Sequence, residues 1–246
     1  MKKMSLLSVL GGLILLFSTC TVDSPLSDLP LTDPSLIQPV ISLERERSSY
    51  GNLSHSATVY LYDKNHNSIE LMDGHVTLNG STLPVKHTSF FGAPYYDATG
   101  LIDEVELGVH YPFIIFLSDG EAYSAHITVQ ENDLHELTLP STHNHTEDMP
   151  ISWQDIDQND PLTVYLSYQY NSESGNGSGT HQLSIPSHNL GTGNYSISAY
   201  ELSNPEGIYH VTVKLSSQKT GTIDSHFRSG RIISSRVSIS GSCNIE

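Results

Sequence analysis

Apolar and polar residues alternate along much of the chain beyond residue 50, as they do in β-strands that bury one face. Ala57, Val59 and Leu61 occupy every second position of one such segment, so they share one face of a strand. Segments with the spacing of an amphipathic helix are hard to find. The pattern therefore predicts an all-β protein.

Turn residues separate the alternating segments and join them into hairpins. Asn79-Gly80 follows an alternating segment, and this dipeptide is a strong signal for a tight hairpin turn. Asp119-Gly120 separates the apolar run 113–117 from a further alternating segment in the same way. Short strands joined by such turns predict β-sandwiches.

The second half of the chain continues this pattern. Two long strands are predicted, with faces formed by Leu162, Val164, Leu166, Tyr168 and Tyr170, and by Tyr209, Val211, Val213 and Leu215. Residues 175–179 have the sequence Gly-Asn-Gly-Ser-Gly. A segment of this composition is typical of a flexible loop.

The length of the chain predicts two domains. After residue 40, 246 − 40 = 206 residues remain, which suits two sandwiches of roughly 100 residues each. A polar segment without periodicity lies between Pro140 and Pro150. We expect a β-sandwich domain at 41–140, a linker at 141–150 and a second β-sandwich domain at 151–246.

The start of the second domain carries a resemblance. Pro150-Ile151-Ser152-Trp153, followed by a polar break and a long alternating strand, resembles the opening of an immunoglobulin-like or fibronectin type III-like module. The resemblance implies two tandem immunoglobulin-like β-sandwich domains and a core position for Trp153, the only tryptophan. A fold of this kind does not determine a function.

The chain begins like an exported protein. Met1-Lys2-Lys3 precedes a largely apolar stretch of 12 residues, Leu6 to Phe17, and then small polar Ser18-Thr19. This order is typical of a secretory signal, and the stretch is shorter than the roughly 20 residues that span a bilayer. We predict a signal peptide at 1–19.

Cys20, directly after this stretch, resembles the cysteine of bacterial lipoprotein signals. The resemblance implies that the Cys20 thiol is acylated and becomes the mature amino terminus, although Phe17 and Thr19 depart from the usual pattern. Secretion by an ordinary signal peptidase is the alternative. If Cys20 is acylated, Cys243 is a lone thiol. The alternative is a disulfide between Cys20 and Cys243 in a chain that is unprocessed or cut elsewhere.

Prolines punctuate the segment after Cys20. Pro25, Pro30, Pro34 and Pro39 lie among Ser, Asp and Leu residues without a helix or strand period, which predicts a disordered tether at 20–40. The expected location is the cell envelope, with the protein anchored to a membrane by its lipid.

Negative charge dominates the predicted mature protein. The formal net charge is −16, and loss of Lys2 and Lys3 with the signal changes it to 9 − 27 = −18. No Lys or Arg lies between Lys86 and Lys214. Such a field repels nucleic acid and anionic lipid, so we expect no nucleic-acid partner; divalent cations, proteins and glycans remain compatible. The alternative is an acidic surface that only keeps the protein soluble.

Two candidate metal sites follow from the spacing of ligand types. Asp155, Asp157 and Asp160 place carboxylates at intervals with which a loop could wrap Ca²⁺, although Asp160 stands where an EF-hand requires Gly. His143 and His145, with an acidic residue nearby, offer imidazoles to Zn²⁺ or Cu²⁺. The alternative to the calcium site is an acidic loop without a bound ion, and the alternative to the histidine site is a pair of solvated histidines. The sequence therefore predicts no cofactor, with Ca²⁺ as the open alternative.

Aromatic residues gather in one loop-like stretch. Phe90, Phe91, Tyr95 and Tyr96 lie close together around Gly92 and Pro94. If these rings are exposed, they form a stacking platform for a sugar or for an apolar group of a protein. If they are buried, they close one end of the first core.

The sequence shows no pattern typical of an enzyme. It has no GxSxG elbow, and it has no GxxxxGK[ST] phosphate loop or dinucleotide fingerprint. We therefore expect a non-catalytic binding or structural module of the envelope. The alternatives are a calcium-dependent adhesion or carbohydrate-binding protein and a secreted hydrolase.

Overall fold

A computed structural model describes residues 30–48, 50–89, 92–131, 133–134, 136–154, 162–172, 175–185, 193–203 and 206–246. Several sequence predictions lie outside these residues. They are the signal peptide, Cys20, the first part of the tether, Phe90, Phe91 and the three aspartates of the proposed calcium loop.

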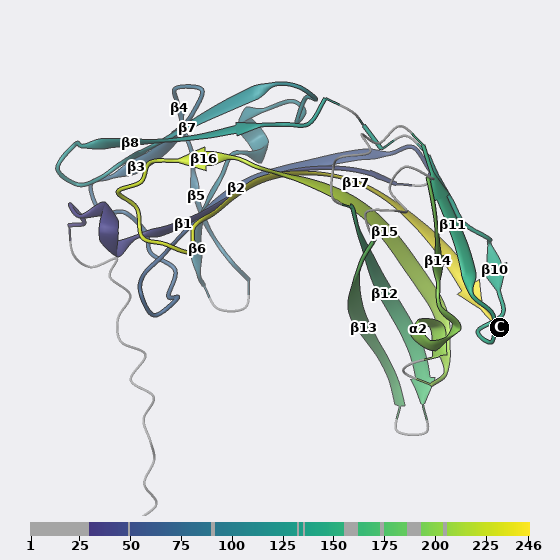
Figure 1. The fold of residues 1–246 in the computed structure, drawn as a ribbon. Helices are drawn as coiled ribbons and strands as arrows, with labels where there is room; N and C mark the ends of the chain where they lie inside the picture. Colours follow the sequence, from purple (N-terminus) through teal and green to yellow (C-terminus); the bar gives the residue numbers. More distant parts are fainter. Residues whose placement is uncertain are drawn as a thin grey trace, which may run out of the picture.

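The described part of the chain is built around one nine-stranded sheet (Figure 1). In spatial order its strands are β13 (Gly175–Ser184), β12 (Leu162–Ser172), β15 (Ile208–Thr220), β17 (Ile232–Ile245), β1 (Gln38–Ser48), β2 (Leu53–Tyr62), β6 (Pro94–Asp97) and β5 (Val85–His87), with β10 (Thr142–His143) paired to β17. The predicted all-β class is confirmed.

Two smaller sheets form a second layer. One contains β16 (Thr222–Ile223), β8 (Ala122–Thr128), β7 (His110–Phe116), β3 (His75–Leu78) and β4 (Ser81–Thr82), and the other contains β14 (Asn194–Ile197), β11 (Met149–Trp153) and β9 (Leu137–Thr138). The short helices described are η2 (Pro34–Leu36), η3 (Thr99–Leu101) and α2 (Ala199–Ser203).

The core lies between the nine-stranded sheet and this second layer. Ala57, Val59 and Leu61 are fully buried on β2, as the alternation predicts, and so is Phe113 on β7. Trp153 is also buried, at 5% exposure, where the resemblance placed it. The buried residues form one cluster that runs through both halves of the molecule.

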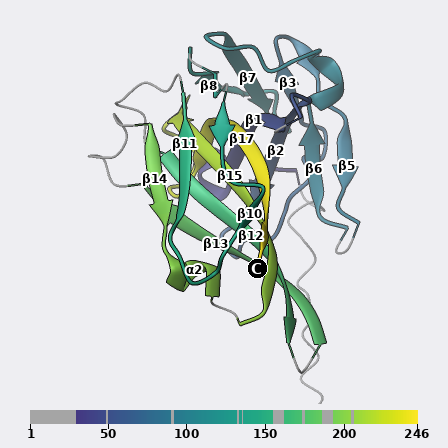
Figure 2. The same cartoon turned by 90° about the vertical axis from the view of Figure 1, so that its right-hand side faces the viewer.

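The long strands arch, and both smaller sheets cover the convex side of the arch. Figure 1 shows β7 and β8 above one end of the long strands and β11 and β14 outside the other end. In Figure 2, β11 and β14 lie in front of β12 and β15, in agreement with this arrangement. The side opposite the core is therefore the concave side of the nine-stranded sheet.

The first and last strands connect the two predicted domains. β1 pairs with β17 in parallel from Val40↔Ile232 to Ser48↔Ser240, and β16 pairs with β8. Segments on both sides of the predicted linker thus share the same sheets. The linker itself contributes β10 and the start of β11, and the division into two domains at 141–150 stays a prediction.

The folded part begins earlier than the predicted tether allows. Leu31 is 3% exposed and Ile37 is fully buried, and Pro34 starts the short helix η2, which Asp33 caps by accepting a hydrogen bond from the Ser35 N–H at 2.9 Å. A proline at the first position of a helical turn supplies a suitable φ. Pro34 therefore helps to shape an ordered entry to β1.

The glycine-rich segment 175–179 forms strand β13, not the flexible loop that its composition indicates. Gly177 and Gly179 lie opposite Tyr170 and Tyr168 of β12, and a Cβ on either glycine would lie 2.5 Å from the ring or hydroxyl of its tyrosine. Each ring thus covers a glycine on the neighbouring edge strand, a device that stabilises such strands.

Gly207, just before β15, is expected to be intolerant of substitution. Its φ is +82°, and an added Cβ would lie 2.0 Å from the Asn171 carbonyl oxygen. We expect Gly207→Ala to lower the free energy of unfolding by about 2 kcal/mol or more, because it combines left-handed strain with a backbone clash. Urea unfolding measures this loss. Gly51→Ala is the control for the effect of φ alone, since Gly51 has a φ of +80° and open space around its Cα. Equal losses of unfolding free energy in the two variants would contradict a contribution from the clash.

None of the helices in the described ranges is long and apolar enough to cross a membrane.

Candidate functional site

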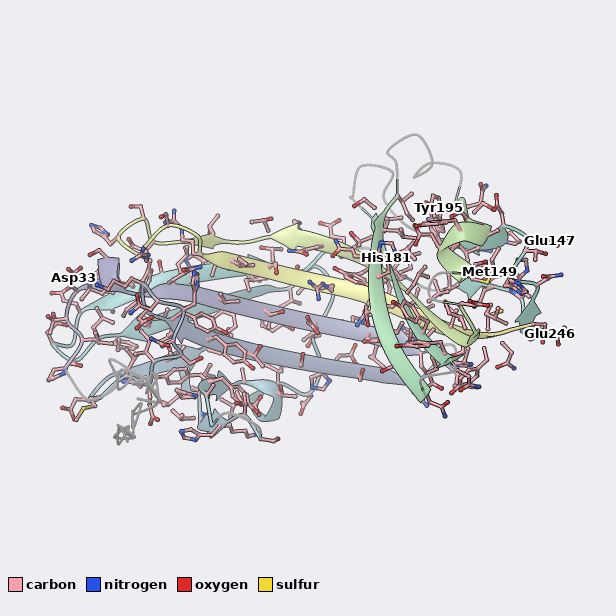
Figure 3. All side chains as sticks on the ribbon, turned by 90° about the horizontal axis from the view of Figure 1, so that it is seen from below. Asp33, Glu147, Met149, His181, Tyr195 and Glu246 are labelled. Atoms are coloured by element: carbon pink, nitrogen blue, oxygen red, sulfur yellow. The ribbon has the colours of Figure 1, made fainter. Side chains whose placement is uncertain are left out.

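The two smaller sheets leave the concave face of the nine-stranded sheet uncovered (Figure 1). Figure 3, which looks at the molecule from below, shows the central strands of this sheet side by side. We define the concave face by the strand positions that alternate with the core positions, namely Ser178, Thr180, Gln182, Thr163, Tyr165, Ser167, Gln169, Thr212, Lys214, Ser216, Gln218, Ser234, Arg236, Ser238, Ser240, Val40, Ser42, Glu44, Glu46, Ser56, Thr58, Tyr60, Tyr62, Tyr95, Asp97 and Lys86. Of these, Ser216, Ser234, Ser238 and Asp97 are buried.

Three tyrosines form a stack at one end of the concave face. The ring centroids of Tyr60 and Tyr62 are 5.9 Å apart with an interplanar angle of 8°. Those of Tyr60 and Tyr95 are 5.4 Å apart at 21°. All three side chains are half-buried, so each leaves part of its ring open to solvent. We call these three residues the tyrosine platform.

Alternation and strand pairing place the platform on this face. Because Val59 points into the core, Tyr60 points away from it. Val59 lies opposite Tyr96 on β6, and residues that lie opposite each other share a face. Tyr96 is consequently buried and its neighbour Tyr95 is turned outward toward Tyr60.

A pocket of about 630 Å³ opens beside the platform. Its lining comprises the three platform tyrosines with Ser68, His87, Thr88, Ser89 and Ala93. The loop at its rim is closed by backbone hydrogen bonds from Thr88 N–H to the Ala93 carbonyl and from Gly92 N–H to the Thr88 carbonyl, both at 3.0 Å. The pocket therefore offers aromatic surface beside hydroxyl and imidazole groups.

Tyr60, the central ring of the platform, remains uncharged at neutral pH. Partial burial raises the pKa of Tyr60, and the neighbouring phenols of Tyr62 and Tyr95 raise it further. Since a phenol ordinarily ionises near pH 10, a raised pKa keeps the hydroxyl of Tyr60 protonated. It can both donate and accept a hydrogen bond.

Charges in the middle of the concave face are paired. Arg236 donates to Glu44 at 3.0 Å, and Lys214 forms an ion pair with Glu46. The Arg236 guanidinium also lies 5.9 Å from the ring centroid of Tyr165, within the range of a cation–π contact. The centre of the face is therefore polar with compensated charge.

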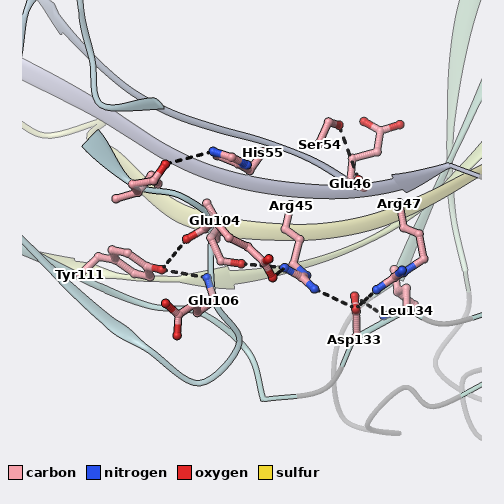
Figure 4. A network of polar contacts seen from close by, with 12 residues as sticks. Arg45, Glu46, Arg47, Ser54, His55, Glu104, Glu106, Tyr111, Asp133 and Leu134 are labelled. Atoms are coloured by element: carbon pink, nitrogen blue, oxygen red, sulfur yellow. Dashed lines mark hydrogen bonds and ion pairs between the residues drawn. The ribbon is translucent and has the colours of Figure 1, made fainter. Parts of the chain in front are cut away.

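A buried charge network lies on the core side of β1 (Figure 4). Arg45 and Arg47 donate to the same oxygen of Asp133 at 3.3 and 2.8 Å, and Arg45 also pairs with Glu104. The side chains of Arg45 and Asp133 are only 8% and 2% exposed. This network connects β1 to two loop segments, and it leaves Arg45 and Asp133 almost no contact with solvent.

Another pocket, with a more apolar lining, lies at the three-stranded sheet. It has a volume of about 580 Å³ and is lined by Leu139, Pro140, Pro150 and Tyr195, among others. Tyr195 is labelled in Figure 3. Within the described residues, no stacked rings line this pocket. It is nevertheless the alternative binding site, the competing pocket, that a binding experiment must distinguish from the platform.

The two histidines of the predicted metal site form hydrogen bonds with backbone oxygens. The His143 ring bonds to the Glu147 carbonyl at 3.0 Å, and the His145 ring bonds to the Glu246 carbonyl at 2.7 Å. Within the described residues, no group of three or more potential metal ligands is close enough together to hold an ion. The carboxylates Asp155, Asp157 and Asp160 lie outside these residues.

Cys243 is a core residue. It is 1% exposed on β17 and is a free thiol. Burial raises the pKa of this thiol, which keeps it protonated and weakly reactive.

The structure separates the members of the predicted aromatic site. Tyr95 lies in the platform, whereas Tyr96 is 2% exposed and accepts a hydrogen bond from the Leu71 N–H at 2.9 Å. Burial raises the pKa of Tyr96 to about 12. Tyr60 and Tyr62 were not predicted as site residues, although the alternation that buries Ala57, Val59 and Leu61 already turns them to the opposite face.

No family model matches the chain, and no curated protein matches it.

Proposed function

We propose that this protein is a lipid-anchored, non-catalytic binding module of the cell envelope whose ligand is a carbohydrate. The single observation that carries the ligand class is the tyrosine platform beside a polar pocket on an uncovered sheet face. The anchor rests on the sequence alone, through the signal-like segment and Cys20.

The platform suits a sugar because of the two kinds of surface that a sugar ring presents. The faces of the ring carry C–H groups, which pack against aromatic rings, and its edge carries hydroxyls, which need hydrogen-bond partners. The pocket supplies such partners from Ser68, Thr88 and Ser89 next to the stacked rings.

The charge of the protein indicates which carbohydrates are suitable ligands. With a net charge of −16, the protein repels polyanions such as uronic-acid polymers. The three basic side chains described on the concave face, Lys86, Lys214 and Arg236, each pair with a carboxylate of the same face. Uncharged glycans are therefore the favoured ligands.

We expect Tyr60→Ala to weaken glycan binding by roughly 30-fold, which corresponds to about 2 kcal/mol, the loss typical of a tyrosine at the centre of a binding site. Tyr60→Phe keeps the ring and should retain most of the affinity. A glycan array followed by calorimetry on the best uncharged glycan measures both effects.

Tyr195→Ala provides the matched control, because Tyr195 is also half-buried on a strand but lines the competing pocket. Its glycan affinity should equal that of the unmodified protein. Loss of binding in Tyr195→Ala with none in Tyr60→Ala, or no binding to any uncharged glycan on the array, would overturn the proposal.

A further inference from the structure

The concave face has a second pocket at its opposite end. This pocket has a volume of about 400 Å³, and its lining consists almost entirely of polar side chains, namely Ser167, Gln169, Ser178, Thr180, His210 and Thr212, together with Tyr168 and Gly179. Thr180, Ser167 and Thr212 lie opposite one another across β13, β12 and β15. They therefore share the face on which the tyrosine platform lies.

The two pockets are too far apart for one small ligand. β12, β15, β17 and β1 lie between β13 and β2, so five strand steps of about 4.8 Å separate Ser178 from Tyr60, or about 24 Å across the sheet. Their offset along the strands adds to this separation. Only an extended molecule can occupy both ends at once.

The surface between the pockets favours an extended, uncharged, hydroxylated chain. Its accessible side chains include Tyr165 near the middle and hydroxyl and amide groups, which both donate and accept hydrogen bonds. These groups are Ser42, Thr163, Thr212, Gln218 and Ser240, whereas Ser216, Ser234 and Ser238 of the same face are buried. Its charged residues are paired among themselves, as Glu44–Arg236 and Glu46–Lys214. An ionic polymer would find no unpaired opposite charge on the described part of this face.

We infer that the concave face binds one linear, uncharged polysaccharide chain that runs from the tyrosine platform to the pocket between β12, β13 and β15. The inference rests on the proposed carbohydrate-binding function and adds to it the length of the ligand and its path. The platform stacks against sugar rings at one end, and the polar pocket holds a later part of the same chain through hydrogen bonds.

The dependence of affinity on ligand length tests the inference. Calorimetry on cello-, manno- and chito-oligosaccharide series, from the disaccharide to soluble long chains, should show an affinity that rises by roughly tenfold or more once the chain spans both pockets. Tyr60→Ala should weaken binding at every length, because the platform holds both short and long ligands.

A bulky residue in the second pocket isolates its contribution. Ser178→Trp should fill this pocket and abolish the gain in affinity for long chains, while the affinity for short chains stays unchanged. Ser196→Trp is the matched control, since Ser196 is also an exposed serine on an outer strand and lines the competing pocket. It should leave the whole length profile intact, and thermal melting checks that both variants are folded.

The outcomes separate the two proposals. Short oligosaccharides that bind through Tyr60 with no gain at greater length would overturn the inference and leave the proposed function standing. A length gain that survives Ser178→Trp, or is lost equally in Ser196→Trp, would also overturn it. If no series binds at all, both proposals fail together.

Discussion

Replacing Asp133 with alanine is expected to lower the free energy of unfolding by about 3–5 kcal/mol. Asp133 is 4% exposed and is the shared acceptor of Arg45 and Arg47. Its removal leaves two arginines without this acceptor, and Arg45 is almost fully buried. Breaking a buried pair from one side costs this much because the remaining charge stays out of water. Urea unfolding at neutral pH measures the loss, and Asp103→Ala, at an exposed aspartate, should change it by less than about 0.5 kcal/mol.

The same carboxylate should make stability depend on pH in acid. Burial by itself raises the pKa of Asp133, but hydrogen bonds and charge from Arg47 and Arg45 outweigh burial and hold the pKa below its ordinary value of 3.8. The stabilisation is therefore fully present above that value and is lost as the pH falls through the lower pKa of the folded protein. Asp133→Asn should lose stability less steeply than the unmodified protein over this acid range. Equal slopes would contradict a stabilising role for the charge.

Phe113→Ala is expected to cost about 3–5 kcal/mol, because it deletes a fully buried ring from the core between the sheets. For a protein of this size, such a loss lowers the midpoint of thermal unfolding by roughly 10 °C. Differential scanning calorimetry measures it. Ile114→Ala, on the same strand but only half-buried, should cost clearly less, and similar costs at the two positions would contradict the described orientation of β7.

The thermogram of Phe113→Ala also tests how far the two halves unfold together. Because β1 pairs with β17 and the buried residues form one cluster, we expect a single transition that shifts as a whole. Two transitions, of which only one shifts, would instead support the two domains predicted from the sequence.

The sequence predicted those strands and turns that depend on residues close together along the chain. Alternation identified β2, β12 and β15, and Asn79-Gly80 identified the β3–β4 turn, in which both residues have positive φ. It was misleading at 175–179, because the stabilisation of these glycines comes from Tyr168 and Tyr170 of another strand. The parallel pairing of β1 with β17 joins residues nearly two hundred positions apart, and no local pattern encodes it.

The candidate site was likewise only partly predictable from local sequence patterns. The aromatic stretch around Tyr95 was recognised from its composition, but half of its described tyrosines belong to the core because strand alternation splits Tyr95 from Tyr96. The partners of Tyr95 come from β2, more than thirty residues earlier. The concave face depends on the order of eight strands, which periodicity alone cannot supply.

Glycan binding at the tyrosine platform is tested most directly by observing which tyrosine rings respond to an uncharged glycan. NMR of the protein with isotope-labelled tyrosine, titrated with the oligosaccharide that binds most tightly, reports on each ring once single Tyr→Phe variants assign the signals. We expect the signals of Tyr60, Tyr62 and Tyr95 to shift and the signal of Tyr195 to stay in place. A shift at Tyr195 with an unchanged platform would contradict glycan binding at the platform.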